Sequence, residues 1–482
     1  MTDQAVTDQD LLARLEAVGA VLWPLFHIVL AGAVTLHVLA RKRDVAASIA
    51  WIGLAWLSPI IGSALYFLFG VNRVQRRAFR AGRRRGLYRV EDPATFLNPR
   101  HDHFAPLERT IGVLTGRPSR LGNTVTMLRN GDEAYPLMLE AIASAEVSVA
   151  LSSYIFKADE IGERFIAALE AAKARGVAIR VIVDGIGSGY WYSPVYRRLE
   201  EAGIPVARFM HTLVPWRMSF LNLRSHKKIL VTDGTRAFIG GLNISAANLL
   251  KAKPRHPVRD MHFDVTGPVV GQIAEAFATD WHFCTGERLG GDAWFPPLAE
   301  TGTAAARVVT SGPDQDIFKI EFAMLQAIGC AQRSIKILTP YFLPDDRLMS
   351  ALVLAVMAGV KVDVVIPECC DHPWMDWAMR AHMGPLLRAG AQVWRAPMPF
   401  EHAKLFVVDD GWSLIGSANW DMRSLRLNFE INMEVCCPHF SALVAEAIEQ
   451  RQANLLSVAE LAQRPALMRL RDSAVRLFLP YL

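Results

Sequence analysis

The chain has 482 residues, of which 52% are hydrophobic and 21% are charged, and its formal net charge is +5. This composition excludes an intrinsically disordered protein and a collagen-like repeat, and the length suits about two to four domains with cores of their own. The six cysteines show neither a CxxC pair nor a metal-ligand spacing. Because Cys369–Cys370 and Cys436–Cys437 are adjacent pairs, a disulfide framework is disfavoured and we expect a reducing compartment.

Two apolar runs near the N-terminus predict a membrane anchor over residues 1–72. No residue is charged from 20 to 40 or from 46 to 70, and a helix needs about 20 apolar residues to cross the hydrocarbon core. Acidic residues outnumber basic ones before the first run, which argues against a secretory signal peptide. A pair of buried core helices is the alternative interpretation of these runs.

An arginine-rich segment follows the second apolar run. Eight arginines and no acidic residue lie between Arg73 and Arg89, so we expect residues 73–115 to form a basic juxtamembrane linker that attracts anionic lipid headgroups. The positive-inside rule then places the remainder of the chain in the cytoplasm, although the basic turn at 41–43 must lie outside. A basic cluster confined to one short segment does not suit nucleic-acid binding.

The remainder of the chain repeats itself. Met138–Ile142 recurs as Met324–Ile328, and each half shows the pattern helix, strand, helix, strand that is typical of an α/β layer. The repeat is too long for a solenoid, so it indicates a duplicated domain. We expect one α/β domain over 116–300, a second over 301–482, and a site at their interface.

The most informative part of the repeat is a pair of matching eight-residue stretches. His226–Asp233 reads HKKILVTD, His402–Asp409 reads HAKLFVVD, and a glycine and an asparagine follow each at the same spacing. On a strand, a histidine and the lysine two residues later project from one face. The residues that this pattern singles out are His226, Lys228, Asp233, Asn243, His402, Lys404, Asp409 and Asn419.

Two such faces meeting at an interface hold the groups that metal-free phosphodiester chemistry needs. One imidazole can attack phosphorus and the other can protonate the leaving alkoxide, while the lysines and amides bind the remaining oxygens. We therefore expect no metal and no other cofactor, and two histidines that titrate as a coupled pair. A single HxK would more often be an ordinary surface histidine; the duplication argues against that. Asp233 and Asp409 follow their strands at turn signals, so we expect mainly a structural role for them.

The paired HxKxxxxD stretches, with their downstream glycine and asparagine, resemble the HKD motifs of the phospholipase D superfamily. Trp51–Gly53, Pro59–Gly62, Tyr66–Gly70, Thr339–Phe342 and Asn428–Asn432 are further similar to stretches of bacterial cardiolipin synthases. The resemblance covers nearly the whole chain. It implies an α/β protein with two duplicated phospholipase D-like α/β/α domains that share one active site. An N-terminal two-segment transmembrane anchor in the bacterial inner membrane precedes these domains.

The resemblance also implies a covalent phosphohistidine intermediate. One motif histidine carries a phosphatidyl group, and the other acts as general acid and then as general base. We assign His226 as the nucleophile, although the sequence does not distinguish it from His402. Asp260 and Glu430 occupy the positions of the family's orienting acids; a carboxylate on the far ring nitrogen fixes the tautomer and stabilises the imidazolium.

The reaction that the resemblance implies transfers a phosphatidyl group from one phosphatidylglycerol to another and releases glycerol. Hydrolysis to phosphatidic acid uses the same motifs and is the alternative, separated from transfer by how well the site excludes water. A nuclease would share the chemistry, but two membrane segments and the lack of dispersed basic patches argue against it. An inactive lipid-binding scaffold would not need both complete motifs.

We therefore expect a phospholipid substrate, a membrane partner and no nucleic acid, and the sequence leaves an oligomer open. Ser417, which the first half replaces with Gly241, puts a hydroxyl on one side only and leaves the acceptor preference open. Residues 213–221 and 466–479 combine apolar side chains with arginine and are candidates for contact with the headgroup region. A buried connector and an ordinary packing helix are equally good interpretations of these two segments.

Overall fold

The computed structural model describes residues 2–41, 45–67, 102–211, 223–313 and 316–477. The chain divides into two compact units, Met1–Arg76 and Arg77–Leu482. The arginine cluster between Arg73 and Arg89 and the segment 213–221 lie outside the described residues.

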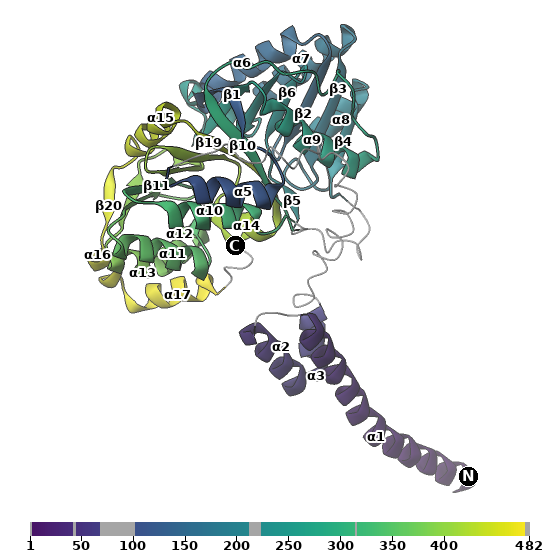
Figure 1. The fold of residues 1–482 in the computed structure, drawn as a ribbon. Coiled ribbons are helices and arrows are strands. Elements are labelled where there is room, and N and C mark those ends of the chain that lie inside the picture. The colour runs from purple at the N-terminus through teal and green to yellow at the C-terminus, as the bar shows by residue number, and fades with distance from the viewer. Residues whose placement is uncertain (1, 42–44, 68–101, 212–222, 314–315, 478–482) are drawn as a thin grey trace. The chain divides into compact units, whose positions relative to one another are not determined.

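The N-terminal unit consists of the helices α1 (Thr2–Arg41), α2 (Val45–Leu57) and α3 (Pro59–Leu65), drawn in purple in Figure 1. Within the described residues, Val18–Ala40 of α1 is the one stretch long and apolar enough to cross a membrane. The second apolar run is not one continuous helix, because Pro59 cannot continue α2 and instead starts α3 after Ser58. The two-segment transmembrane anchor therefore stays a prediction.

The three helices of this unit pack on one another. Val34 and Val38 of α1 form a small core with Ala55 and Tyr66, and the Tyr66 hydroxyl lies 2.6 Å from Nδ1 of His37. A Cβ at Gly62 would lie 2.3 Å from the carbonyl oxygen of Leu54. Glycine is thus required where α3 closes on α2.

The larger unit is built on a 16-stranded sheet, in which fifteen strands follow one another and the sixteenth, β5, pairs with β19 off that path. In order across the sheet, its strands are β20 (Asn454–Leu456), β14 (Gln392–Ala396), β13 (Lys361–Pro367), β11 (Ser334–Leu338), β16 (Leu405–Val408), β17 (Trp412–Gly416), β19 (Asn428–Cys436), β10 (Ala304–Ser311), β1 (Arg120–Arg129), β9 (Met261–Thr266), β7 (Arg236–Gly240), β6 (Ile229–Thr232), β2 (Ser148–Ser153), β3 (Ala178–Asp184) and β4 (Val206–Phe209). Shorter pairings join β5 (Arg224–Ser225) to β19, β15 (Phe400–Glu401) to β8 (Val258–Arg259), and β12 (Phe342–Leu343) to β18 (Trp420–Asp421).

The two flanks of the sheet show the same arrangement. On one flank β6 is antiparallel to β2, and β2, β3 and β4 are parallel. On the other flank β16 is antiparallel to β11, and β11, β13 and β14 are parallel. The strand within each histidine motif, β6 or β16, therefore takes the same place in its half.

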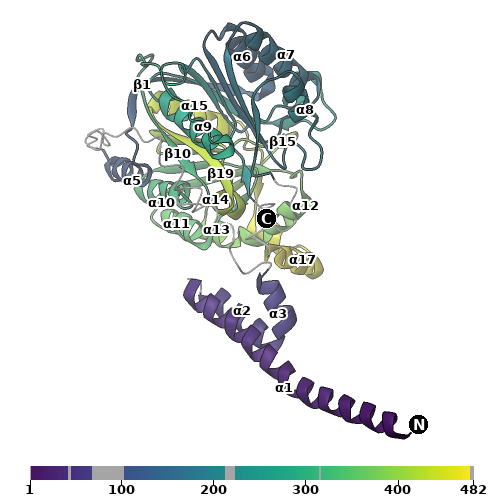
Figure 2. The ribbon, with the colours of Figure 1, turned by 90° about the vertical axis from the view of Figure 1, so that its right-hand side faces the viewer.

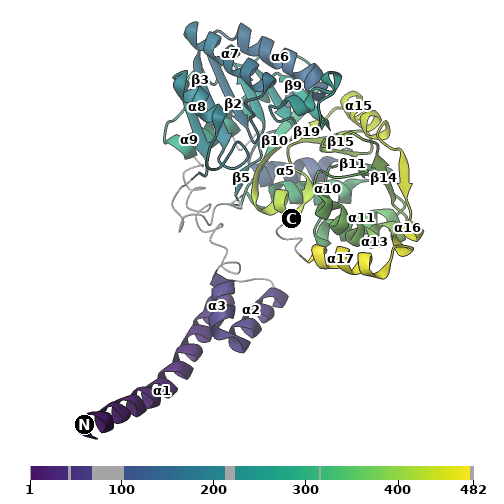
Figure 3. The same ribbon diagram turned by 180° about the vertical axis from the view of Figure 1, so that it is seen from behind.

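Helices cover both faces of the sheet. One face carries α6 (Asn130–Ser144), α7 (Glu160–Ala174) and α8 (Pro194–Glu201) over the first half and α5 (Ala105–Thr115), α10 (Lys319–Cys330), α11 (Asp346–Met357), α12 (Pro373–His382) and α13 (Gly384–Ala389) over the second (Figure 3). The other face carries α9 (Val270–Thr285) and α15 (Pro438–Glu449), which lie side by side over one shared core (Figure 2). The remaining elements are α14 (Met422–Arg426), α16 (Val458–Ala462), α17 (Ala466–Arg476) and the short 3₁₀ turns η5 (Ala246–Asn248) and η6 (Leu250–Ala252).

The strands within the two motifs, β6 and β16, are buried on both faces. Leu230 packs under α6–α8, whereas its neighbours Ile229 and Val231 pack in the core of α9 and α15. Phe406 and Leu405 alternate in the same way in the second half. Successive strand residues point to opposite faces, so these continuous apolar runs place each motif between two cores.

The end of the segment that we predicted as a linker is a packed helix. Leu107 and Ile111 of α5 belong to the core of the second half. Below α5, the fully buried Arg307 of β10 donates to Glu434 Oε1 of β19 at 2.5 Å and to Glu108 Oε2 of α5 at 3.2 Å. This ion-pair cluster ties α5 to the middle strands of the sheet.

We predict that Arg307→Leu lowers the free energy of unfolding by about 3–5 kcal/mol, because it leaves two buried carboxylates without their cation. Arg236→Leu is the matched control: Arg236 also lies on a strand and pairs with Asp264 at 2.7 Å, but it is partly exposed, so its loss should cost about 1 kcal/mol or less. Denaturant unfolding of the detergent-solubilised protein measures both. Equal effects of the two substitutions would contradict the role assigned to Arg307.

Candidate active site

The sheet brings the two motif histidines to the same edge. Ile229 at the start of β6 lies opposite Ser152 near the end of β2, and Leu405 at the start of β16 lies opposite Leu338 at the end of β11. His226 and His402 precede these strands, so each lies at the carboxyl end of the parallel strands of its half. This edge is where α/β sheets usually bind their ligands.

Each histidine is anchored on the other half of the chain. β5, just before His226, pairs with β19, and β15, just before His402, pairs with β8. The backbone nitrogen of His226 donates to the carbonyl oxygen of Phe429 at 2.9 Å, and that of His402 donates to Arg259 at 2.7 Å. Where the two halves meet, the short strand before each motif histidine therefore pairs with a strand of the other half.

The same exchange gives each histidine its carboxylate. Glu430, next to Phe429, places Oε2 3.0 Å from Nδ1 of His226. Asp260, next to Arg259, places Oδ2 2.6 Å from Nδ1 of His402. The sequence predicted both acids as orienting residues, but it did not predict that each lies beside the histidine of the opposite half.

The proton on His226 can be assigned from its partners. Nδ1 of His226 lies 3.0 Å from the carbonyl oxygen of Ser417 as well as near Glu430. A carbonyl oxygen only accepts hydrogen bonds, so Nδ1 is the protonated nitrogen. Nε2 then keeps its lone pair, as a nucleophile requires.

The two motif lysines are buried beside the histidines. Lys228 donates to the carbonyl oxygen of His226 at 2.6 Å. Lys404 donates to the carbonyl oxygen of His402, and its Nζ lies 2.9 Å from Nδ1 of that histidine. Burial lowers the pKa of Lys228 to about 7 and that of Lys404 to about 8. An anion bound between them would favour their charged forms.

The two histidine–acid pairs differ electrostatically. Burial, followed by the charges of the motif lysines, lowers the pKa of both His226 and His402. Burial also raises the pKa of Glu430, to about 7. Burial also tends to raise the pKa of Asp260. The charges of Lys404 and His402 outweigh this effect, so the pKa of Asp260 lies below its ordinary value. At neutral pH His402 thus faces a carboxylate, whereas His226 faces an acid near its titration point.

The two halves differ at Gly241 and Ser417, and the neighbouring acids explain this difference. The Ser417 hydroxyl donates to Glu430 Oε2 at 2.5 Å and accepts from the Ile431 nitrogen at 3.0 Å. At Gly241 a Cβ would lie 2.2 Å from Oδ1 of Asp260. Serine therefore fits beside the glutamate and not beside the aspartate.

The two motif asparagines lie at the same edge of the sheet as the histidines. Oδ1 of Asn243 accepts from the backbone nitrogen of Ile155, just after β2, at 3.2 Å. The buried Asn419 precedes β18, which pairs with β12 after β11, and it hydrogen-bonds the side chain of Asp421. In the part of the chain that the structure describes, Oδ1 of Asn419 has no hydrogen-bond partner.

The motif aspartates lie apart from the rest of the site, at the opposite ends of β6 and β16. Asp233 accepts hydrogen bonds from the nitrogens of Val147 at 2.7 Å and Ser148 at 2.9 Å. Asp409 accepts from Arg333 at 2.7 Å and from Ser334 at 2.8 Å. Each carboxylate thus fixes the loop that leads into β2 or β11, and neither contacts a motif histidine.

Sequence reasoning missed two neighbours of His226. The Tyr154 ring lies edge-on to the His226 ring with centroids 5.0 Å apart, and Nη1 of Arg224 donates to the Tyr154 hydroxyl at 2.7 Å. Tyr154 directly follows β2, and Tyr341 lies three residues beyond the end of β11. A tyrosine shortly after the corresponding strand of each half was the available signal.

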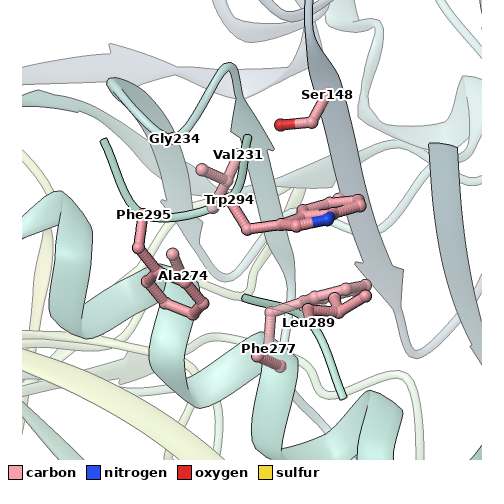
Figure 4. Close-up of a pocket in the computed structure, with 10 residues that line it drawn as sticks. Ser148, Val231, Gly234, Ala274, Phe277, Leu289, Trp294 and Phe295 are labelled. Carbon is pink, nitrogen blue, oxygen red and sulfur yellow. The ribbon is translucent and has the colours of Figure 1, made fainter. Parts of the chain in front are cut away.

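A small apolar pocket lies away from these groups, at the sheet edge where β2 starts at Ser148 and Gly234 follows the end of β6. Figure 4 shows Trp294, Phe295, Phe277 and Leu289 around it. Such a lining does not suit a phosphate group. Among the described residues, no three or more histidines, cysteines or acids are grouped so that they could hold a metal ion.

Comparisons with a family model and with individual relatives identify one protein family. The family described as "Cardiolipin synthase, PLD-like domain" matches residues 138–281 and 324–452. The cardiolipin synthase of Geobacillus kaustophilus is 32% identical over 93% of this chain and 91% of its own length. The major cardiolipin synthase ClsA of Bacillus subtilis is 31% identical over 97% of this chain and its full length.

The fold has a relative among solved structures. A phosphatidylserine synthase of Haemophilus influenzae matches 78% of this chain and all of its own, with a TM-score of 0.59 at 13% identity. That likeness concerns the mixed α/β fold alone. The two matched segments and the relatives at more than 30% identity show that the chain belongs to the cardiolipin synthase family of phospholipase D-like enzymes.

Proposed function

We propose that this enzyme joins two phosphatidylglycerol molecules into cardiolipin, releasing glycerol, through a phosphohistidine at His226. The observation that carries the proposal is the exchanged pairing of His226 with Glu430 and of His402 with Asp260. It gives one site two histidines whose surroundings differ, as a nucleophile and a general acid require.

We further propose that the chain consists of two duplicated phospholipase D-like domains, 116–300 and 301–482, that share this site. Two observations support the duplication: the family matches two separate segments, and the strands on the two flanks of the sheet follow one order. Neither half contains both a histidine and the acid that orients it, so each domain would need the other for catalysis.

In the first step, Nε2 of His226 attacks the phosphorus of a bound phosphatidylglycerol. A nitrogen–phosphorus bond forms, the bond from phosphorus to the glycerol oxygen breaks, and His402 donates its proton to that oxygen. In the second step, a hydroxyl of another phosphatidylglycerol gives its proton to His402 and attacks phosphorus, which releases His226. Two phosphatidylglycerols thus give one cardiolipin and one glycerol, with the proton of His402 restored.

The electrostatics support this division of roles. Burial and the charge of Lys404 lower the pKa of His402, but ionised Asp260 opposes this lowering and stabilises a positive charge on that histidine, which suits an acid. Glu430, with its pKa raised by burial to about 7, stabilises a charge on His226 less, so His226 stays neutral. Lys228, Lys404 and the two asparagines are placed to bind the remaining phosphate oxygens. Asp233 and Asp409 support the loops and have no part in the chemistry.

Transfer rather than hydrolysis fits the burial of the site. His226 is 7% exposed and Lys228 is 2% exposed, so bulk water has little access to a phosphohistidine there. A lipid acceptor arrives from the same two-dimensional membrane as the donor. Hydrolysis to phosphatidic acid is the outcome against which the reaction must be tested.

We propose that the chain is a multi-pass protein of the bacterial inner membrane whose catalytic domains are cytoplasmic. The apolar stretch of α1 and the following apolar run over 46–70 support an anchor within residues 1–72, and the arginines after residue 72 support the orientation. On α17, Leu467 is 80% and Leu470 is 67% exposed, among arginines. Such a helix suits the headgroup region of an anionic bilayer.

We predict that the purified full-length protein, in mixed micelles with phosphatidylglycerol as the sole phospholipid, makes cardiolipin and glycerol in equal amounts. His226→Ala should abolish both products, since no phosphatidyl group can be taken up. Thin-layer chromatography of the lipids and an enzymatic glycerol assay measure them. Phosphatidic acid in place of cardiolipin would make the enzyme a hydrolase.

A second prediction separates the two histidines. A phosphatidyl ester of p-nitrophenol has a leaving group that needs no proton, so His402→Ala should still release one equivalent of p-nitrophenolate in a burst and retain the phosphatidyl label on His226. His226→Ala should show no burst. Stopped-flow absorbance and peptide mapping give the two readouts. A burst from His226→Ala, with label on position 402, would reverse the assignment.

The lysines predict an alkaline limit to activity. Because binding of the phosphodiester needs charged lysines, kcat/KM should fall as the pH rises through the lowered pKa values of Lys228 and Lys404, about 7 and 8. A bound anion favours the protonated lysines, so the corresponding fall in kcat should lie at higher pH. Initial rates between pH 6 and 10 test this; a kcat/KM that stays constant over that range would contradict it.

A further inference from the structure

The His226 side of the site carries an arginine that the proposed mechanism does not use. Arg224 lies two residues before His226, and its Nη1 donates to the Tyr154 hydroxyl at 2.7 Å. Within the described residues, Nε of Arg224 is buried and has no hydrogen-bond partner. One phenol ring thus lies between this guanidinium and the histidine, whose ring centroid is 5.0 Å from that of Tyr154.

A second guanidinium shares the same region. Arg423 lies in the first turn of α14, four residues after Asn419. Burial lowers the pKa of Arg423, and the charge of Arg224 lowers it further. Burial raises the pKa of Tyr154, while the charges of both arginines lower it. Arg224 thus contacts Tyr154 directly, and Arg423 lies near enough for its charge to act on both. Two like charges in one region favour an anion beside them.

The nearby carboxylates are already engaged by the backbone. Asp184 accepts hydrogen bonds from the nitrogens of Gly187 and Ser225 at 2.8 Å each, and Asp421 caps α14 by accepting from Ser424 at 2.7 Å. Burial raises the pKa of each of these two aspartates to about 6. Both carboxylates are thus held at fixed positions by backbone nitrogens, which take up part of their hydrogen-bonding capacity.

The two arginines occur on one side of the shared site only. In the register of the histidine motifs, the second-half counterpart of Arg224 is Phe400. In the register of the asparagines, the first-half counterpart of Arg423 is Ala247. In the proposed mechanism both motif lysines bind the oxygens of the reacting phosphate. An additional cation pair on one side suits a ligand that carries a second phosphate on that side.

We propose that Arg224 and Arg423, positioned by Tyr154, bind the intact phosphate of the acceptor phosphatidylglycerol. This inference rests on the proposed function. The two phosphorus atoms of the product are joined through a three-carbon bridge of six bonds, which at full extension reaches roughly 7 Å, or two Cα–Cα steps. The acceptor hydroxyl can then reach the phosphohistidine while its own phosphate stays on the arginines. The subsite makes a lipid phosphate the preferred acceptor over water or free glycerol.

The test compares two acceptors on one enzyme. With phosphatidylglycerol in mixed micelles, cardiolipin formation uses an acceptor with a phosphate, whereas incorporation of labelled glycerol into phosphatidylglycerol uses an acceptor without one. In Arg423→Gln and Arg224→Gln, the ratio of cardiolipin formation to glycerol exchange should fall about tenfold or more, since a charge-assisted contact is lost. Glycerol exchange itself should change by less than about twofold.

Arg197→Gln is the matched control, because Arg197 is exposed on α8 and pairs with Glu201 at 3.6 Å; both reactions should be unchanged. Arg423→Lys should restore part of the ratio by returning the charge. Glycerol exchange also reports that each variant is folded. A parallel loss of both reactions, or an unchanged ratio, would overturn the acceptor subsite. Absence of both reactions from the wild type would instead contradict the proposed function.

Discussion

The exchange of short strands between the two halves is the constraint on which the site depends. β5 lies on β19 and β15 lies on β8, and each pairing is only two residues long. Because Glu430 follows Phe429 and Asp260 follows Arg259, the backbone bonds that hold the motifs also deliver the carboxylates. If the halves were separated, each histidine would lose its anchor and its acid together.

Burial turns this near-symmetric frame into a site with two distinct sides. The histidine–acid pairs are related by the exchange, yet burial raises the pKa of Glu430 to about 7, whereas charges keep that of Asp260 low. Ser417 beside Glu430, and Gly241 beside Asp260, are the local adjustments that accompany the difference. Arg224 and Arg423 add charge on the His226 side alone. The proposed reaction needs such an asymmetry, since one histidine attacks phosphorus while the other exchanges a proton with both the leaving and the entering alcohol.

Much of this could be predicted from the sequence, and the rest depends on contacts that leave no sequence pattern. The apolar runs after the motif lysines predict strands buried on both faces, and Ile229–Thr232 and Leu405–Val408 are such strands. The turn signals after them predict structural aspartates, and Asp233 and Asp409 bind loop backbone. The exchange was missed because two-residue strands have no periodicity, and Arg423 was missed because only the fold brings it near Tyr154. α5 was missed because the segment's charge suggested a linker, whereas Leu107 and Ile111 pack in a core.

The most direct test of the central claim, that each acid serves the histidine of the other half, is ¹⁵N NMR of the histidine ring nitrogens. Selectively labelled full-length protein in detergent would be compared with Asp260→Asn and Glu430→Gln, with His226→Ala and His402→Ala providing the assignments. We predict that Asp260→Asn shifts the Nδ1 resonance of His402 and that Glu430→Gln shifts that of His226. If each acid instead affected the histidine of its own half, the exchanged pairing would be wrong, and with it the proposed roles.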